Sequence, residues 1–330
     1  MKNNSFQEIW GKLKNSKKIL MSLHNGPDGD SLGSCTALKY VLERDLNSKV
    51  VLVSPDNLDQ VLSKLPFSKD INFGKSISQF NLKEFDVLLF LDQGAIFYDK
   101  KDIKINLKDI FIINIDHHVT NSFYGNLNYV NVEQPSVCSI LLDFLKINKI
   151  KFDRELSRRL LLGICTDTDF FKHGNINKSL KDVSFLIDNG ANYTKDIVQP
   201  ILDNQPLKMK KYYALLINNL KINKQKKFGY SSISYKNIKN LNLNLSEIRL
   251  GIAQIQDLDE IDFLFTLVEM KDSIKGSFRS RKNVDVSLFA KALGGGGHKP
   301  AAAFMLSKMP LKRAEKIVIE SIRKIGVHKY

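Results

Sequence analysis

The segment Lys17–Asp30 reads KKILMSLHNGPDGD, and it combines a buried strand with a cluster of reactive side chains. Lys17–Leu23 is a short apolar run, which is typical of a strand covered on both faces. Directly after it come His24, Asp28 and Asp30. The same order, an apolar run followed by acids or imidazoles, recurs twice further along the chain. This segment therefore predicts both the type of β-sheet and the edge of that sheet at which the reactive side chains lie.

Three more apolar runs follow, separated by stretches of helical length. The runs are Lys49–Ser54, Asp86–Leu91 and Ile110–Ile115, and the helical patterns are Ser31–Asp45, Ser136–Leu145, Asp153–Cys165 and Ser179–Asn189. Strands that alternate with helices form βαβ units. We therefore predict an α/β fold with a doubly wound, mainly parallel sheet.

The pattern changes between residues 191 and 207, where Pro200 and Pro206 interrupt it. The later sequence predicts a smaller α+β domain with strands at Gly229–Tyr235, Phe263–Met270, Ser273–Ser280 and 301–306, and helices at Leu207–Leu220, Val286–Leu293 and Leu311–Ile325. The Lys/Asn-rich stretch 221–227 is interpreted as a solvated turn. The expected organisation is a first domain over 1–190, a linker with a connecting helix over 191–222, and a second domain over 223–330.

The charge of the 330 residues is uneven. Residues 1–190 hold 25 Lys+Arg and 23 Asp+Glu, whereas residues 191–330 hold 25 and 12. A strongly basic half indicates an anionic partner. A Lys-rich composition that only keeps the protein soluble is an equally simple explanation, so charge alone does not decide between them.

Several classes of protein are excluded. No apolar run approaches ~18 residues, so we expect no transmembrane helix. The polar start, Met1–Trp10, does not have the apolar core of a signal peptide. Three scattered cysteines, Cys35, Cys138 and Cys165, exclude a disulfide framework and a zinc ribbon. We expect a soluble, cytoplasmic protein that does not bind membranes.

Acidic and imidazole side chains follow four predicted elements. In open α/β sheets, ligands bind beyond the carboxyl ends of the strands, so three of these groups meet at one rim. Asp and His suit Mn²⁺, and two such ions about 3.5–4 Å apart are a common device for phosphoester hydrolysis. Each group alone is more often a helix cap or a turn. Together they favour a metal site formed by His24, Asp28, Asp30, Asp92, Asp116, His117, His118 and Asp167.

The basic half has a candidate anion site of its own. Gly294–Gly297 is followed by His298, and four consecutive glycines let the backbone approach a ligand and direct its N–H groups at an anion. A flexible hinge would not need the histidine. Ser277, Arg279 and Arg281 alternate along a predicted strand, so they share a face suited to phosphate. Taken alone, that face is more often solvated.

These motifs resemble the DHH phosphoesterase superfamily over almost the whole chain. His24-x-x-x-Asp28-x-Asp30, Asp92, Asp116-His117-His118 and Asp167 match its four motifs in order. The Ser-Phe-Arg-Ser and Gly-Gly-Gly-Gly-His segments match its DHH-associated C-terminal domain. The resemblance implies a metal-binding catalytic domain over 1–190 and a substrate-binding domain over 223–330.

The resemblance also implies roles for individual residues. Two Mn²⁺ ions, with Mg²⁺ or Co²⁺ as substitutes, would be held by His24, Asp28 and Asp92 and by Asp30, Asp92, His117 and Asp167. Asp92 would bridge the ions, Asp116 would orient His117, and His118 would face the substrate phosphate, which makes Asp92, Asp116 and His118 the expected catalytic residues. The substrate would be bound by Arg279, Ser280, Gly295, Gly296, Gly297 and His298.

Three residues depart from the family's usual pattern. Gln93 and Gly94 follow Asp92, where other residues are expected, and Asp169 stands where the family often has glycine. None of them removes a ligand, so they bear on the preferred substrate rather than on activity.

The family's small members hydrolyse short nucleotides. The leading expectation is a Mn²⁺-dependent phosphodiesterase that cuts cyclic-di-AMP, linear pApA, or both, to 5′-nucleotides. One alternative is an oligoribonuclease and 3′-phosphoadenosine 5′-phosphate phosphatase. Another, of a different class, is a nucleotide- or RNA-binding protein without catalysis. Long nucleic acid is not an expected partner, whereas a homodimer is compatible with the family.

Overall fold

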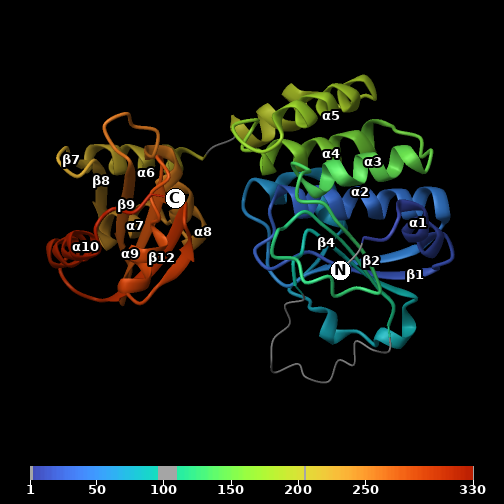
Figure 1. Ribbon diagram of the computed structural model, residues 1–330, viewed down its shortest axis with the longest axis horizontal. Helices are drawn as coiled ribbons and strands as arrows, with labels where there is room; N and C mark the ends of the chain where they lie inside the picture. Colours follow the sequence, from blue (N-terminus) through green and yellow to red (C-terminus); the bar gives the residue numbers. More distant parts are fainter. Residues whose placement is uncertain (1–2, 96–109, 204–205, 330) are drawn as a thin grey trace. The chain divides into compact units, whose positions relative to one another are not determined.

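The computed structural model describes residues 3–95, 110–203 and 206–329 of the chain (Figure 1). It divides into two compact units, Met1–Asn204 and Gln205–Tyr330. The division falls inside the predicted 191–222 linker, and that linker is shared between the units. Thr194–Leu202 forms a π-helix whose Ile197 is buried in the first core, whereas the expected connecting helix packs in the second.

The first unit is an α/β layer structure. Its six strands are all parallel, in the order β3-β2-β1-β4-β5-β6. The strands are β1 (Lys18–Ser22), β2 (Lys49–Ser54), β3 (Asn72–Phe73), β4 (Val87–Leu91), β5 (Ile112–Asp116) and β6 (Leu127–Val130). The α/β class and the parallel sheet are therefore confirmed, and the long apolar runs form the central strands.

Helices stack on one side of this sheet (Figure 1). They are α1 (Phe6–Lys14), α2 (Gly29–Leu46), α3 (Val137–Ile147), α4 (Arg154–Asp167) and α5 (Ile176–Asp188). The larger core lies on this side. The other side buries a smaller cluster that includes Leu20, Leu88 and Phe90 beneath the one-turn 3-10 helices 77–79 and 82–84. The sheet is thus covered unequally by the described part of the chain.

The second unit is a mixed sheet with helices on both faces. The strand order is β11-β12-β10-β9-β8-β7, and only β8 and β9 run parallel. The strands are β7 (Lys221–Asn223), β8 (Phe228–Ile233), β9 (Phe263–Glu269), β10 (Ser273–Ser280), β11 (Gly296–His298) and β12 (Ala301–Ser307). The helices are α6 (Leu207–Asn218), α7 (Tyr235–Leu241), α8 (Leu245–Gly251), α9 (Ser287–Ala292) and α10 (Leu311–Ile325).

Two local predictions in this unit are wrong. The stretch 221–227 is not all turn, because Lys221–Asn223 pairs with β8 as an edge strand and only the next four residues turn. The strand expected to reach Tyr235 ends at Ile233, because Ser234 caps α7 by accepting a hydrogen bond from Asn237 N–H.

No helix in the described ranges is both long and apolar enough to cross a membrane.

Candidate metal centre

His24 and Asp28 lie in the turn between β1 and α2. Asp28 is the N-cap of α2, and its Oδ1 accepts the backbone N–H groups of Asp30 and Ser31 at 3.0 Å. His24 Nδ1 donates to the Asn25 carbonyl, which leaves Nε2 facing two carboxylates. That atom lies 3.6 Å from Asp28 Oδ1 and 3.5 Å from Asp92 Oδ2. Burial alone would lower the pKa of His24, but these two carboxylates raise it to about 11.

Asp92 is the centre of the cluster. It follows β4 with a φ of 60°, an uncommon conformation for a residue with a side chain, and its N–H donates to the Ile115 carbonyl. The side chain is 3% exposed. Burial and the carboxylates of Asp30 and Asp28 raise the pKa of Asp92 to about 8, against the opposing hydrogen bond from His24. A buried carboxylate on strained backbone, surrounded by other carboxylates, is typical of a functional site.

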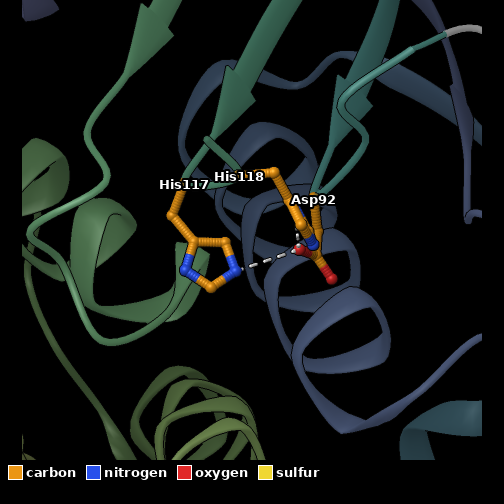
Figure 2. Close-up of side chains that lie close together, drawn as sticks. All are labelled: Asp92, His117 and His118. Carbon is orange, nitrogen blue, oxygen red and sulfur yellow. Dashed lines mark ion pairs between the residues drawn. The ribbon is translucent and has the colours of Figure 1, made fainter. Parts of the chain in front are cut away.

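The Asp-His-His segment ends β5 and directs both imidazoles at Asp92 (Figure 2). His117 Nε2 lies 3.6 Å from Asp92 Oδ1 and 3.4 Å from Asp167 Oδ2. His118 Nδ1 lies 3.6 Å from Asp92 Oδ1 and donates to Asp116 Oδ1 at 2.7 Å. The Asp116 bond raises the pKa of His118 to about 9. The His118 ring is therefore a cation at neutral pH in the protein without ligands.

The expectation that Asp116 orients the His117 ring is wrong in this structure. From His117, Asp116 accepts only the backbone N–H, and the imidazole that it contacts is that of His118. The His117 ring instead donates from Nδ1 to the Gln134 carbonyl at 3.4 Å. In extended backbone, residues two apart share a face, so Asp116 meets His118 and not His117.

A partly buried amide network supports Asp116, and its residues were not among the predicted site residues. Asn121 Nδ2 donates to Asp116 Oδ2 at 2.5 Å and to Asn114 Oδ1 at 2.8 Å. Gln93, one of the departures from the family pattern, is buried and donates from Nε2 to the Ser22 carbonyl at 2.7 Å. Gln93 therefore ties the end of β4 to the end of β1. A signal was present in Asn114, a polar residue within the apolar run 110–115.

Asp30 and Asp167 complete the cluster from two helices. Asp30 is 1% exposed, and its oxygens accept the N–H groups of Val137 and Cys138 at the start of α3, at 2.6 and 3.0 Å. Asp167 is the last residue of α4. Burial and the carboxylates of Asp30, Asp92 and Asp28 raise the pKa of Asp167 to about 9.

Asp169 turns away from the cluster. It begins a run of three left-handed residues, with φ values of 44°, 55° and 70° at Asp169, Phe170 and Phe171. Its carboxylate pairs with Lys172 Nζ at 3.1 Å, and the side chain is 46% exposed. The left-handed backbone explains why glycine suits this position.

Asp92, His117 and His118 form one group of possible metal ligands among the described residues, and the predicted ligands themselves form two groups of three. One group is His24, Asp28 and Asp92, and the other is Asp30, His117 and Asp167; within each group the candidate ligand atoms lie within 4.8 Å of one another. Asp92 contacts a histidine of each group, so it lies between them. This arrangement offers two adjacent cation sites of Asp and His, the ligand set expected for Mn²⁺.

Two hollows flank the cluster on the first unit. One has a volume of about 640 Å³ and is lined by His24, Asp92, His118 and Asp167 among others. The other, about 630 Å³, is lined by His117, Gln134, Asp167 and His173 among others. Each volume is within the range of small-ligand sites. Asp167 borders both hollows.

The structure places the residues predicted in the second unit in different environments. Arg279 lies on β10, half-buried, with Nη1 donating to its neighbour's carbonyl at 3.0 Å. Ser280 lies on the opposite face of the strand, where its Oγ accepts the Val284 N–H at 2.7 Å, so it caps a turn rather than joining Arg279. Arg281 lies beyond the strand and pairs with Asp259 at 2.7 Å.

The glycine segment is partly a strand. Gly295 N–H already donates to the Ala290 carbonyl at 2.8 Å, so it is not free for an anion. Gly296, Gly297 and His298 form β11 against β12, and all three are exposed. A Cβ on Gly295 would lie 2.2 Å from the Ala303 carbonyl oxygen, whereas one on Gly296 would meet nothing within 4 Å. Position 295 therefore requires glycine, because a Cβ there would collide with β12. A side chain at position 296 would have space.

Comparisons with known proteins agree with this architecture. A family model described as the DHH family N-terminal domain matches residues 18–164, and one described as the DHHA1 domain matches residues 249–324. The chain is 28% identical over 304 residues to the probable bifunctional oligoribonuclease and PAP phosphatase NrnA of Streptococcus mutans, covering 90% of this chain and 92% of that protein.

Solved structures share the fold. An exopolyphosphatase-related protein from Bacteroides fragilis superposes with a TM-score of 0.84 at 21% identity, covering 97% of this chain and 95% of that one. The exonuclease RecJ bound to manganese superposes with a TM-score of 0.54 at 14% identity, covering 97% and 94%.

Proposed function

We propose that this chain, a metal-dependent phosphoesterase of the DHH superfamily, hydrolyses short linear nucleotides to 5′-nucleotides with two Mn²⁺ ions. The observation that carries the proposal is the pair of ligand groups that meet at Asp92. Paired cations separated by one carboxylate are the usual arrangement for in-line displacement at phosphorus.

The residues fit two divalent cations. Burial and the neighbouring carboxylates raise the pKa values of Asp92 and Asp167, and Asp28 and Asp92 raise the pKa of His24. Bound cations would replace protons on these side chains and remove the repulsion between the carboxylates. His24, Asp28 and Asp92 would hold one ion, and Asp30, Asp92, His117 and Asp167 the other. When bound, two such ions lower the pKa of a water molecule and neutralise phosphate charge.

His118 supplies a hydrogen-bond donor from the chain itself at the proposed reaction centre. Its ring is held by Asp116, which is itself fixed by Asn121, so the imidazolium has one orientation. It lines the hollow of about 640 Å³ beside Asp92 and Asp167. We assign His118 the role of donating a hydrogen bond to a phosphate oxygen as negative charge develops there. Asp116 is the residue that positions it.

The second unit supplies further anion-binding groups. Arg279 carries no ion pair among the described residues, and Gly296, Gly297 and His298 are exposed on β11, which β12 separates from the strand of Arg279. We assign these four residues to binding the nucleotide, which leaves Ser280 and Gly295 as structural residues of the unit.

The choice of substrate follows the relatives. The Streptococcus mutans relative is named a probable bifunctional oligoribonuclease and PAP phosphatase, and this name supports linear dinucleotides, short RNA and 3′-phosphoadenosine 5′-phosphate as the substrate class. Cyclic-di-AMP is the competing substrate. A protein that only binds nucleotides would not need to keep all six ligands together, so a catalytic role is favoured over pure binding.

A chromatographic time course with Mn²⁺ tests this proposal. The substrates are pApA, a five-nucleotide RNA, 3′-phosphoadenosine 5′-phosphate and cyclic-di-AMP, each incubated with the wild-type protein and with Asp92→Ala. We expect AMP from the linear substrates and a loss of at least about a thousandfold in Asp92→Ala, because both ions lose a shared ligand.

Two results would contradict it. If Asp92→Ala turns over pApA normally, the two-cation scheme is wrong. If cyclic-di-AMP is opened faster than pApA is cut, the protein acts on a cyclic signal and not on linear products.

A further inference from the structure

Another hollow of the first unit is lined by none of the residues of the candidate metal centre. Its volume is about 260 Å³. Three segments enclose it: residues 64–67 after β2, the first turns of α4, and the π-helix Thr194–Leu202. All three belong to the first unit, so the hollow is formed within one compact body.

The lining of this hollow is basic. Its charged side chains are four cations and one carboxylate, namely Lys64, Arg154, Arg158, Lys195 and Asp196. Residues 1–190 hold nearly equal numbers of basic and acidic residues, 25 and 23, so a ratio of four to one is a local departure. Cations that share a concave surface repel one another and create a positive potential, which an anion relieves.

Glu155 holds two arginines in place at this wall. Its Oε2 accepts hydrogen bonds from Arg158 Nη2 at 2.6 Å and from Arg159 Nη1 at 2.8 Å. Both guanidinium groups lie over the ring of Phe67, at 5.6 and 5.1 Å from its centroid. A guanidinium fixed by stacking and by an ion pair has little freedom left to lose when it binds an anion.

Arg158 keeps a donor without a partner. Its Nε is buried and has no hydrogen-bond partner among the described residues. A buried donor left unpaired is costly, and such groups are normally satisfied by water or by a bound ligand. The single carboxylate of Glu155 serves Arg159 as well, so it cannot neutralise both arginines.

The other three cations are disposed differently. Arg154 donates to Asp196 Oδ1 at 2.8 Å and to the Gly190 carbonyl at 3.0 Å, and it lies at the positive end of the α4 dipole, which adds to its charge. Lys64 and Lys195 are exposed, and within the described ranges no ion pair joins either of them to a carboxylate. Both lysines are therefore available to a ligand.

We propose that this hollow binds inorganic diphosphate, with Arg158, Lys64 and Lys195 donating hydrogen bonds to its oxygens. A volume of about 260 Å³ lies below the ~300–1,000 Å³ of sites for drug-sized molecules, so it suits a compact anion better than a whole nucleotide. One phosphate group carries about −1.5 to −2 charges at neutral pH, and two linked groups carry more. Diphosphate therefore matches the excess of cations better than phosphate does. This site is independent of the proposed function.

A binding experiment that needs no turnover tests the site. Isothermal titration calorimetry of the full chain in EDTA compares sodium pyrophosphate with sulfate at equal ionic strength. The variants are Arg158→Gln and the double variant Lys64→Gln/Lys195→Gln, and the control is Lys14→Gln/Lys181→Gln. The control removes two exposed lysines of α1 and α5 that do not line the hollow, so it matches the change in net charge.

We expect both variants to bind pyrophosphate at least about tenfold more weakly than wild type, because charged hydrogen bonds are lost, and the control to bind as wild type does. We expect sulfate to bind more weakly than pyrophosphate. Lys64 and Lys195 are exposed, so their double variant keeps the test meaningful even where Arg158→Gln does not fold.

Three results would overturn the proposal. Equal pyrophosphate affinity in wild type and in the double variant would place the anion elsewhere on the chain. Sulfate binding as tight as that of pyrophosphate would mean that the hollow does not select diphosphate. A parallel titration with ADP tests the size argument, and an effect of the double variant on ADP but not on pyrophosphate would assign the hollow to a nucleotide.

Discussion

Asp86 joins two strands through a single carboxylate. Its Oδ2 accepts the backbone N–H groups of Lys17 and Lys18 at 2.7 and 2.9 Å, and these bonds hold the pKa of Asp86 below its usual value. Because the folded-state pKa is lowered, the stabilisation is present above the unfolded pKa of about 3.9 and is lost as the pH falls through the lower folded value.

This predicts a pH-dependent effect of Asp86→Asn. At pH 7 we expect the variant to lose about 1 kcal/mol of unfolding free energy, a modest figure because the side chain is exposed. The difference from wild type should shrink below about pH 4. Urea unfolding at a series of pH values measures it, with the exposed Asp70→Asn as control. A difference that stays constant from pH 7 to pH 3 would refute the charge-based explanation.

Single ligands were predictable from the sequence, but their partners were not. His24, Asp92 and His117 follow apolar runs, and the local order of residues is enough to place them at one edge. Asn121 and Gln93 support the site through bonds to residues 5 and 71 positions away in the chain. Such contacts depend on tertiary structure, so no periodicity signals them. The same holds for the pairing of Asp116 with His118.

Two helices of the first unit approach each other through glycine. An ideal Cβ on Gly33 of α2 would lie 2.5 Å from the Arg159 carbonyl oxygen of α4 and 3.1 Å from Cys138 Sγ. Because the obstacle is backbone, neither helix can adjust cheaply. The close packing positions α4, whose last residue is Asp167, against the helix that begins after Asp28.

We therefore expect Gly33→Ala to destabilise the first unit by roughly 1–3 kcal/mol, although alanine favours helix. Gly11→Ala in α1 is the matched control, because a Cβ there meets nothing within 4 Å. It should stabilise the protein by about 0.5–1 kcal/mol. Denaturant unfolding followed by Trp10 fluorescence compares them. Two changes of the same sign would mean that the close helix contact does not govern stability.

The strength of the local hydrophobic pattern explains which helices and strands could be predicted from the sequence. The apolar runs gave β1, β2, β4 and β5, whereas Leu127–Val130 has only an alternating LNYV pattern and was missed. Helix α1 was also missed, although Ser5 and Glu8 form a capping box that its sequence displays. Pro200 indicated a break between 191 and 207, but a π-helix accommodates it there.

The order of strands accounts for where the candidate metal centre lies in the first unit. The chain winds outward in opposite directions from β1 and β4, which are neighbours in the sheet. Such a switch point leaves a crevice at the carboxyl ends of the two strands. His24 and Asp28 follow one of them and Asp92 follows the other. The sequence indicated that the ligands lie along one edge of the sheet. Local patterns do not reveal the order of the strands, and it is this order that locates the candidate metal site between β1 and β4.

Cation binding should stabilise the first unit selectively, since both ligand groups belong to it and none occurs among residues 206–329 as described. The chain's one tryptophan, Trp10, packs edge-on against Phe144 in that unit. At Mn²⁺ a hundredfold above its Kd, binding contributes about 2.7 kcal/mol, enough to raise the Tm of a unit this size by about 5–10 °C. Heating with Trp10 fluorescence as probe, in EDTA and in Mn²⁺, should show this rise.

Calorimetry under the same conditions separates the two units. The Mn²⁺-dependent rise should appear in one transition only, and Asp92→Ala should reduce it because each ion loses a ligand. A Trp10 midpoint that is equal in EDTA and Mn²⁺ would mean that the crowded carboxylates remain protonated rather than bind cations. An equal shift of both transitions would instead show that the second unit gains from the ions as much as the first, which a centre built only from His24, Asp28, Asp30, Asp92, His117 and Asp167 does not predict.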